Sequence, residues 1–253
     1  MFRRALTLAL PVLLAFTAAC GGGDDTEAKK TETLTVFAAA SLTETFTELG
    51  KTFEAEHDGV TVKFNFGSSA TLAQQITQGA PADVFAAASP ATMQTVVDAS
   101  LAAGPTTFVS NKLEIAVPAG NPAKIKDFAD LAKPDVKVAL CAEQVPCGAA
   151  AKKAIEAAGL KITPVTLEQD VKATLTKVTL GEVDAALVYR TDVLAAGDKV
   201  EGIAFPEAEK AINDYPVVAL KDAPASDLAA QFVTLVLSPQ AKDLFTKAGF
   251  TTP

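Results

Sequence analysis

The sequence predicts an α/β protein in which short apolar strands alternate with amphipathic helices. Three observations lead to this prediction: the alternation itself, a recurring turn in which a strand runs through small residues into a helix, and two long extended segments at 106–117 and 203–220. Strands that alternate with helices form largely parallel sheets with helices on their faces. The extended segments are suited to crossing between two domains. A chain of 253 residues with 49% apolar side chains is long enough for one large or two modest domains with their own cores.

The first third of the chain contains the recurring turn twice. The strand predicted over 34–38 leads through alanines to Ser41, and the strand over 60–66 leads through a glycine and a serine to Ser69. Apolar residues at helical spacing predict a helix after each turn. Ser41 stands three residues before Glu44, which is the spacing of a capping box. The other elements predicted here are helices over 41–56 and 70–78, a strand over 82–86 and a helix opened by Ser89-Pro90.

The rest of the chain continues the alternation. Apolar runs bounded by glycine or proline predict further strands, and apolar residues at a period of 3.6 predict further helices. The predicted strands cover 136–140, 160–165 and 183–189, with two more around Ala204 and Val217. The predicted helices cover 125–131, 149–158, 227–237 and 240–248, and two others begin at Gln169-Asp170-Val171 and Arg190-Thr191-Asp192. Ser238-Pro239 predicts a serine cap at the start of the helix over 240–248, as Ser89-Pro90 does for the earlier helix.

Each recurring turn brings a helix N-terminus and a serine hydroxyl to the carboxyl end of a strand. The first N–H groups of a helix have no partner within the helix and favour negative charge, so an anion can bind there. Ser41 and Ser69 are therefore candidate anion-binding residues. The alternative is that each serine only caps its helix.

The composition argues against several other functions. The chain has 22 Lys and Arg against 30 Asp and Glu, a net charge of −8, and no basic cluster, which argues against a nucleic-acid partner. His57 is the single histidine, and we interpret it as a solvated turn residue before Asp58 and Gly59. A zinc site with several histidine ligands is therefore not possible, and a Ser-His-Asp triad would depend on this one histidine.

The N-terminal segment carries export signals. We interpret residues 1–19 as a signal peptide, because Arg3 and Arg4 precede an apolar stretch that is short for a membrane span. Cys20, with the small residues before it, resembles a bacterial lipoprotein signal, in which the cysteine is lipidated and becomes the mature N-terminus. Residues 20–33 would form a flexible tether. We therefore expect an exported protein anchored by lipid at the extracytoplasmic face of the cell membrane, with plain secretion as the alternative.

The two remaining cysteines are close in sequence. Lipidation of Cys20 leaves Cys141 and Cys147, and an even pair in an exported protein favours a disulfide. Closing so short a loop would stabilise the fold by about 2 kcal/mol in the chain-entropy model. Two free thiols are the alternative.

Several segments together resemble the molybdate-binding proteins of ABC-type uptake systems, and the resemblance extends from about residue 34 to the C-terminus. Each motif is weak alone, whereas their joint order and spacing are specific. The segments are Val36-Phe37-Ala38-Ala39-Ala40-Ser41-Leu42-Thr43, Phe66-Gly67-Ser68-Ser69-Ala70-Thr71-Leu72-Ala73-Gln74-Gln75-Ile76, Gly79-Ala80-Pro81-Ala82-Asp83-Val84-Phe85, Val145-Pro146-Cys147-Gly148, Asp170-Val171-Lys172, Val188-Tyr189 and Ala248-Gly249-Phe250.

This resemblance implies a two-lobed periplasmic-binding-protein fold of type II. Each lobe would be a mostly parallel sheet flanked by helices, with lobe 1 formed by 34–110 plus 212–253 and lobe 2 by 111–211. The anion would bind in the cleft between the lobes. The protein would be a monomeric receptor and not an enzyme, would need no cofactor, and would deliver molybdate, and also tungstate, to the transmembrane subunits of an ABC permease.

The resemblance also implies a set of ligand residues. Ser41 and Ser69 would each offer a hydroxyl and an amide, Cys147 and Val171 a backbone N–H, and Tyr189 its phenol O–H. Molybdenum would bind as the oxyanion, with no side chain bonded directly to the metal. Cys147 stands where the family usually has alanine, a change that is tolerable because its role is through the backbone.

A site made of donors suits molybdate and tungstate, which near neutral pH are dianions with four acceptor oxygens and no hydrogen. Hydrogen phosphate carries an O–H that needs an acceptor, so a site without acceptors leaves it one partner short. Two other functions remain open. One is a receptor for another tetrahedral oxyanion such as sulfate. The other is a serine hydrolase with Ser41 or Ser69 as nucleophile, against which the sequence offers no suitable histidine and no Ser-x-x-Lys at either serine.

Overall fold

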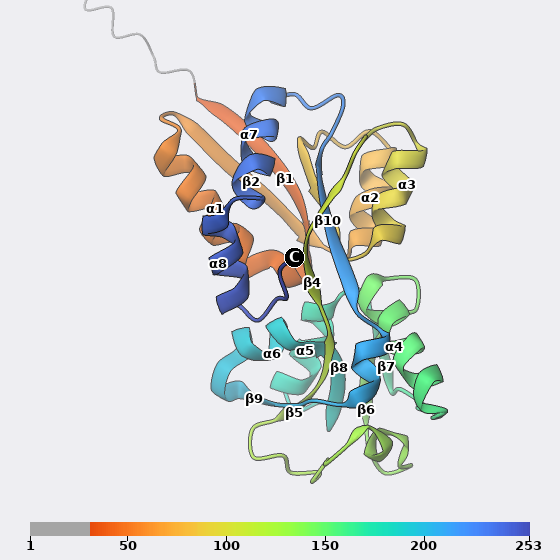
Figure 1. The fold of residues 1–253 in the computed structure, drawn as a ribbon. Coiled ribbons are helices and arrows are strands. Elements are labelled where there is room, and N and C mark those ends of the chain that lie inside the picture. Colours follow the sequence, from red (N-terminus) through yellow and green to blue (C-terminus); the bar gives the residue numbers. More distant parts are fainter. Residues whose placement is uncertain (1–30) are drawn as a thin grey trace, which may run out of the picture. The chain divides into compact units, whose positions relative to one another are not determined.

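The computed structural model describes residues 31–253 (Figure 1). The predicted signal peptide over 1–19, the predicted lipidation site Cys20 and the tether up to residue 30 lie outside the described residues. The first strand, β1 (Glu32–Ala39), begins within the last residues of the predicted tether. Within residues 31–253, no helix has the length and apolar character that a membrane crossing requires.

The first sheet contains five strands in the order β2-β1-β3-β10-β4. β1 pairs in parallel with β2 and β3, whereas β10 is antiparallel to β3 and β4. The parallel pairing places the carboxyl ends of β1, β2 and β3 at one edge of the sheet, and in Figure 1 this edge faces the second sheet. The other strands of this sheet are β2 (Val60–Gly67), β3 (Val84–Ala86), β4 (Thr106–Asn111) and β10 (Asn213–Ala219).

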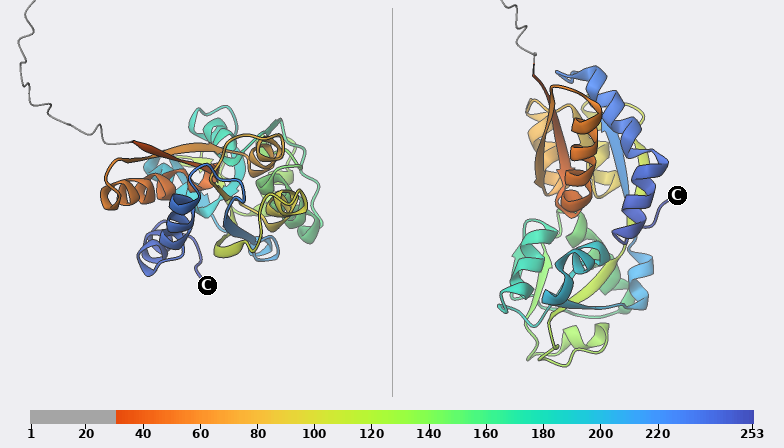
Figure 2. Two further views of the ribbon diagram at one scale, coloured as in Figure 1. Left: turned by 90° about the horizontal axis from the view of Figure 1, so that it is seen from above. Right: turned by 90° about the vertical axis from the view of Figure 1, so that its left-hand side faces the viewer.

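Helices cover both faces of the first sheet (Figures 1 and 2). On one face, the buried ring of Phe46 lies against Phe64, Phe108, Phe232 and Phe245, so aromatic packing joins α1, α7 and α8 to the sheet. A separate apolar cluster joins α2 and α3 to the other face. These elements are the 3₁₀ turn η1 (Ala40–Leu42) and the helices α1 (Thr43–Glu56), α2 (Ser69–Thr77), α3 (Pro90–Asp98), α7 (Ser226–Val236) and α8 (Pro239–Lys247).

The second sheet also contains five strands, in the order β7-β6-β8-β5-β9, and has a core of its own. β6 is parallel to β7 and β8, and β5 is antiparallel to β8 and β9. The strands are β5 (Leu113–Pro118), β6 (Val138–Cys141), β7 (Thr166–Glu168), β8 (Ala185–Tyr189) and β9 (Val200–Ile203). The helices are α4 (Pro146–Ala158), α5 (Val171–Thr179) and α6 (Arg190–Ala196), with 3₁₀ turns η2 (Phe128–Ala132), η3 (Gly197–Lys199) and η4 (Pro206–Lys210).

Two segments cross between the sheets, as the extended stretches predict. β4 ends at Asn111 in the first sheet, and β5 begins at Leu113 in the second. The chain returns after η4 through β10, whose first residue, Asn213, pairs with Asn111. The α/β class is therefore confirmed. Each sheet is mixed because strands next to the crossings, β10 and β5, run antiparallel to their neighbours.

Three local predictions are wrong. The segment 160–165 is not a strand, since the ladder with β6 begins only at Thr166. Ser41 does not cap a helix, because the chain enters α1 through a 3₁₀ turn that starts at Ala40 and neither N-terminus has a side-chain cap. The helix predicted over 149–158 begins earlier, at Pro146, which places Cys147 in its first turn. The caps predicted at Ser89 and Ser238 are confirmed, and each accepts a hydrogen bond from a backbone N–H of its helix.

Candidate functional site

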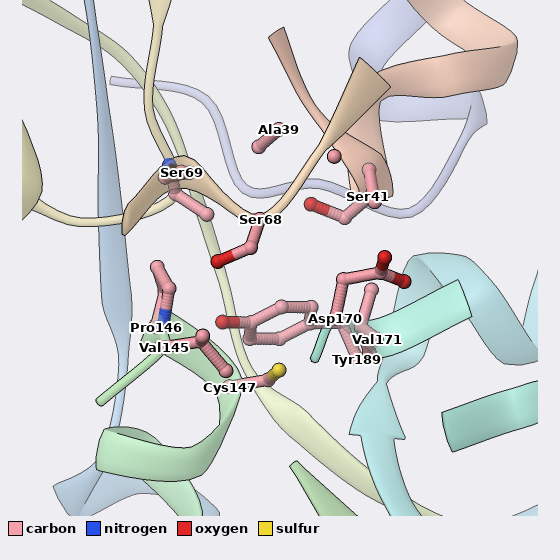
Figure 3. A pocket seen from close by; sticks show the side chains of 13 residues that line it. Ala39, Ser41, Ser68, Ser69, Val145, Pro146, Cys147, Asp170, Val171 and Tyr189 are labelled. Atoms are coloured by element: carbon pink, nitrogen blue, oxygen red, sulfur yellow. Dashed lines mark hydrogen bonds between the residues drawn. The ribbon is translucent and has the colours of Figure 1, made fainter. Parts of the chain in front are cut away.

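A pocket lies where ends of both sheets and the first turns of several helices meet (Figure 3). Its volume, including the part that is open to solvent, is about 230 Å³. The upper wall comes from the turns after β1, β2 and β3, and the lower wall comes from the starts of α4 and α5 and the end of β8. The pocket is lined by Ala39, Ala40, Ser41, Gly67, Ser68, Ser69, Ala88, Val145, Pro146, Cys147, Asp170, Val171 and Tyr189.

All five residues predicted to bind the ligand line this one pocket. Ser69 is the first residue of α2, Cys147 the second of α4 and Val171 the first of α5. N–H groups in a first helical turn lack intrahelical acceptors, and the helix dipoles add positive potential there. One helix packed on the first sheet and two packed on the second therefore direct unpaired N–H donors toward the same space. Ser41 and Tyr189 complete the set from η1 and β8.

The two predicted serines are buried and hold their hydroxyls in different ways. Ser69 Oγ accepts a hydrogen bond of 2.9 Å from the Ala88 N–H, so its own hydrogen is left for another acceptor. Ser41 Oγ lies 2.9 Å from the Tyr215 hydroxyl and makes no cap. The Ser69 hydroxyl is therefore held by the backbone just after β3, and the Ser41 hydroxyl by a side chain of β10, rather than by the helices that start beside them.

Tyr189 lies at the bottom of the pocket and is only 1% exposed. The side-chain amide of Asn213 donates a hydrogen bond of 2.6 Å to its hydroxyl oxygen. Burial raises the pKa of the Tyr189 phenol well above its usual value. The phenol therefore keeps its hydrogen at neutral pH and can donate it.

Ser68 also lines the pocket, although it is not among the ligand residues predicted from the sequence. Its hydroxyl oxygen is buried and has no hydrogen-bond partner among the described residues. Figure 3 shows this oxygen directed into the pocket, on the side that faces Tyr189. Unpaired buried hydroxyls are costly, so this oxygen is suited to a ligand. The sequence contains one signal for this residue, the pair Ser68-Ser69. When a helix begins at Ser69, Ser68 is its N-cap residue and lies at the same helix N-terminus.

The predicted disulfide is confirmed. Cys141 at the end of β6 is bonded to Cys147 in the first turn of α4, so the loop between them is closed at the pocket wall. A bonded sulfur carries no thiolate charge that would repel an anion. The link also holds the N-terminus of α4 against its own sheet.

The charge around the pocket is unusual for an anion site, since no lysine or arginine is among the lining residues. Asp170 is the one lining carboxylate, and it caps α5 by accepting from the Ala173 N–H. Lys172 lies beside the pocket, where its ammonium is 2.7 Å from Glu44 of α1 and 3.3 Å from Asp192 of α6. Within residues 31–253, no cluster of three or more His, Cys, Asp or Glu could hold a metal ion. The site can bind an anion chiefly through neutral donors.

The buried carboxyl of Asp192 predicts a pH dependence of folding stability. Burial raises its pKa from 3.8 to about 6, and Lys172 opposes this only in part. The folded state then binds the proton more tightly than the unfolded state, so this group lowers stability as the pH rises from about 4 to about 6, by at most about 3 kcal/mol. In Asp192→Asn this fall should disappear. Urea unfolding of the wild type and Asp192→Asn across that pH range measures the effect, with the exposed Asp198→Asn as control. Equal slopes of unfolding free energy against pH in wild type and Asp192→Asn would contradict the prediction.

Comparisons with known proteins agree with this architecture. A family model described as bacterial extracellular solute-binding protein matches residues 34–251. The molybdate-binding protein ModA of Mycobacterium tuberculosis H37Rv is 42% identical over 248 residues, which cover 96% of this chain and 95% of the relative.

Two solved structures share the two-lobed fold. The periplasmic molybdate-binding protein of Azotobacter vinelandii superposes with a TM-score of 0.76 at 22% identity, covering 87% of this chain and 99% of that one. The sulfate-binding protein SubI of Mycobacterium tuberculosis H37Rv gives 0.72 at 19% identity, covering 87% and 86%. With the family model matched over nearly all of the described residues, the chain belongs to the bacterial extracellular solute-binding proteins.

Proposed function

We propose that this protein is the receptor of an ABC-type uptake system, which captures molybdate outside the cytoplasm and delivers it to the permease. The observation that carries the proposal is a pocket whose walls offer hydroxyl and backbone donors from both sheets and no lysine or arginine. A dianion with four acceptor oxygens and no hydrogen uses such donors fully. The relative of 42% identity named as molybdate-binding ModA supports the choice of anion.

The proposed ligand residues are the five of the sequence analysis together with Ser68. Hydroxyls come from Ser41, Ser68, Ser69 and Tyr189, and backbone N–H groups come from the first turns of α4 and α5 at Cys147 and Val171. Each hydrogen bond to a charged acceptor contributes about 1.5–3 kcal/mol. Short-range donors must act alone here, because the net charge of −8 repels an approaching anion at long range.

Further parts of the proposal concern how the receptor works. Lobe 1 would comprise 34–110 plus 212–253 and lobe 2 111–211, with closure around the anion between them. Lipidation at Cys20 would tether a monomer to the extracytoplasmic face of the membrane. The receptor would have no enzymatic activity and would need no cofactor. Tungstate has a size and charge similar to those of molybdate and would bind at the same site.

Sulfate is the second candidate, because the fold is shared with a sulfate-binding protein. Sulfate is also tetrahedral and fully deprotonated, so the donors alone do not separate it from the larger molybdate. A serine hydrolase is disfavoured because no histidine lines the pocket to activate Ser41, Ser68 or Ser69.

Isothermal titration calorimetry of the wild type with molybdate, tungstate, sulfate and hydrogen phosphate tests the proposal. Molybdate should bind at least about a hundredfold more tightly than sulfate. In a cavity of the size proposed for molybdate, the smaller sulfate makes fewer contacts with the walls. Tighter binding of sulfate would transfer the function to that anion.

Tyr189→Phe should weaken molybdate binding by about tenfold to a hundredfold, the value of one hydrogen bond to a charged acceptor. The ring remains in place, so the melting temperature should change little. Calorimetry and thermal unfolding of this variant check both statements. Wild-type affinity in the variant would remove Tyr189 from the ligand set.

A further inference from the structure

An ion pair joins the two sheets and their helices beside the pocket. The Lys172 ammonium on α5 is 2.7 Å from the Glu44 carboxylate on α1. The apolar side of α1 packs in the core of the first sheet, and that of α5 packs in the core of the second. The chain itself passes between the sheets near residues 112 and 212, so this ion pair is a further, noncovalent link between the two lobes.

The two partners follow ligand residues of opposite pocket walls. Lys172 comes directly after Val171, whose backbone N–H we assign to the anion, and both lie in the first turn of α5. Glu44 lies in the first turn of α1, directly after the 3₁₀ turn that contains Ser41. Neighbours within one helical turn move together because backbone hydrogen bonds hold them. The ion pair therefore sets the separation between the walls at Ser41 and Val171.

Lys172 is also held on its own lobe by a second carboxylate. Its ammonium is 3.3 Å from Asp192 Oδ1, a buried oxygen that has no hydrogen-bond partner among the described residues. Burial lowers the pKa of the Lys172 ammonium, but the carboxylates of Asp192 and Glu44 outweigh burial and raise this pKa, so the ammonium stays charged. An ordinary surface pair must order two long side chains, whereas here Asp192 already orders one of them.

The two lobes also touch where α6 meets the segment after α8. A Cβ at Gly249 would lie 2.4 Å from Leu194 Cδ1, so these residues leave no space for a methyl group between them. One groove is lined by Glu44, Leu194 and Phe250, which places this contact near the ion pair. If the lobes part to admit an anion, the pair between Glu44 and Lys172 must lengthen. The contact of Lys172 with Asp192 lies within one lobe and can remain.

We propose that Lys172 is a positioning residue whose ion pair with Glu44 latches the two lobes over the bound anion and slows its release. This inference rests on the proposed function and deepens it. The pair forms only when the lobes are closed, so it stabilises the bound state and does not alter the encounter of the anion with the open protein. The dissociation rate constant should therefore change when the pair is removed, whereas the association rate constant should not.

Stopped-flow tyrosine fluorescence with molybdate measures both rate constants. The chain has no tryptophan and two tyrosines, of which Tyr189 lines the pocket and Tyr215 contacts Ser41. Glu44→Gln should raise the dissociation rate constant about threefold to fivefold, the upper range for an ion pair whose acidic partner is 53% exposed.

Glu48→Gln is the matched control, because it removes the same charge from the same helix and its partner, Lys51, lies on that helix too. It should leave the dissociation rate constant unchanged. Any faster association that results from the lost negative charge should be equal in Glu48→Gln and Glu44→Gln.

Lys172→Met completes a double-mutant cycle. Its effect on molybdate dissociation should be about threefold smaller in the Glu44→Gln background than in the wild type, since the pair is already absent there. In urea unfolding of the anion-free protein, the two substitutions should be additive. Lys177→Met, on the same helix and paired with Glu182 within the second lobe, should show no such dependence on Glu44.

The outcomes separate the latch from the function beneath it. Equal dissociation rate constants in Glu44→Gln and Glu48→Gln, or an equal effect of Lys172→Met in both backgrounds, would overturn the latch. If Lys172→Met does not fold, the comparison of Glu44→Gln with Glu48→Gln decides the question alone. If the wild type binds sulfate instead of molybdate, the proposed function fails, and the same rate constants measured with sulfate then test the latch.

Discussion

Replacing Ser41 and Ser69 together by alanine is expected to abolish molybdate binding at micromolar protein concentrations. Each substitution removes a hydroxyl that would donate to a charged acceptor, a loss of about 1.5–3 kcal/mol. The two together correspond to about a hundredfold to ten-thousandfold in affinity. Ser69→Ala also leaves the buried Ala88 N–H without its 2.9 Å acceptor, so some folding stability should be lost as well.

Calorimetry measures the affinity, and urea unfolding measures the stability. Ser238→Ala is the matched control, because that serine caps α8 by accepting from the Ala241 N–H and does not line the pocket. The control should lose about 1 kcal/mol of stability and keep its affinity. If the double variant binds molybdate within about threefold of wild type, the anion does not lie at these two turns.

Gly148→Ala is expected to damage both the fold and the site, although it adds a single methyl group. A Cβ at this position would lie 1.9 Å from the carbonyl oxygen of Ala142 and 2.7 Å from that of Cys141. Both atoms belong to the backbone of the loop that the disulfide closes, so neither can rotate away. The N-terminus of α4 must move instead, and it carries the Cys147 N–H that we assign to the ligand.

We expect a loss of about 3 kcal/mol in the free energy of unfolding and about a hundredfold in molybdate affinity. Chemical denaturation and calorimetry measure the two effects. Lys153→Ala, on the exposed side of the same helix, should change neither. A Gly148→Ala protein with wild-type stability would show that the contact between α4 and this loop is looser than the structure has it.

The sequence predicted the fold class because alternation of strands and helices is a local pattern. The crossings at 106–117 and 203–220 and the caps at Ser89 and Ser238 were also predictable, since extended length and Ser-Pro spacing act within a few residues. The strand at 160–165 was not, because strand formation there depends on a partner, and β6 pairs only from Thr166 onward. Local propensity cannot report where a neighbouring strand ends.

In the candidate site, too, local spacing could be read from the sequence, whereas the partners of the side chains could not. Ser41 and Glu44 have the spacing of a capping box, yet Ser41 pairs with Tyr215 and Glu44 with Lys172, partners more than a hundred positions away. Ser68 was overlooked because only burial reveals that its hydroxyl has no partner.

By itself, the sequence determined that strands lead through small residues into helix N-termini, that two cysteines can close a loop, and that the chain has no basic cluster of the kind that binds nucleic acid. Only the tertiary structure decided which hydroxyls and N–H groups converge on one pocket, and that Asn213 and Tyr215 stand behind two of them. The physical reason is range. Helix starts and turns depend on neighbours in sequence, whereas the direction of a buried hydroxyl hydrogen depends on acceptors and donors that only folding brings within 3 Å.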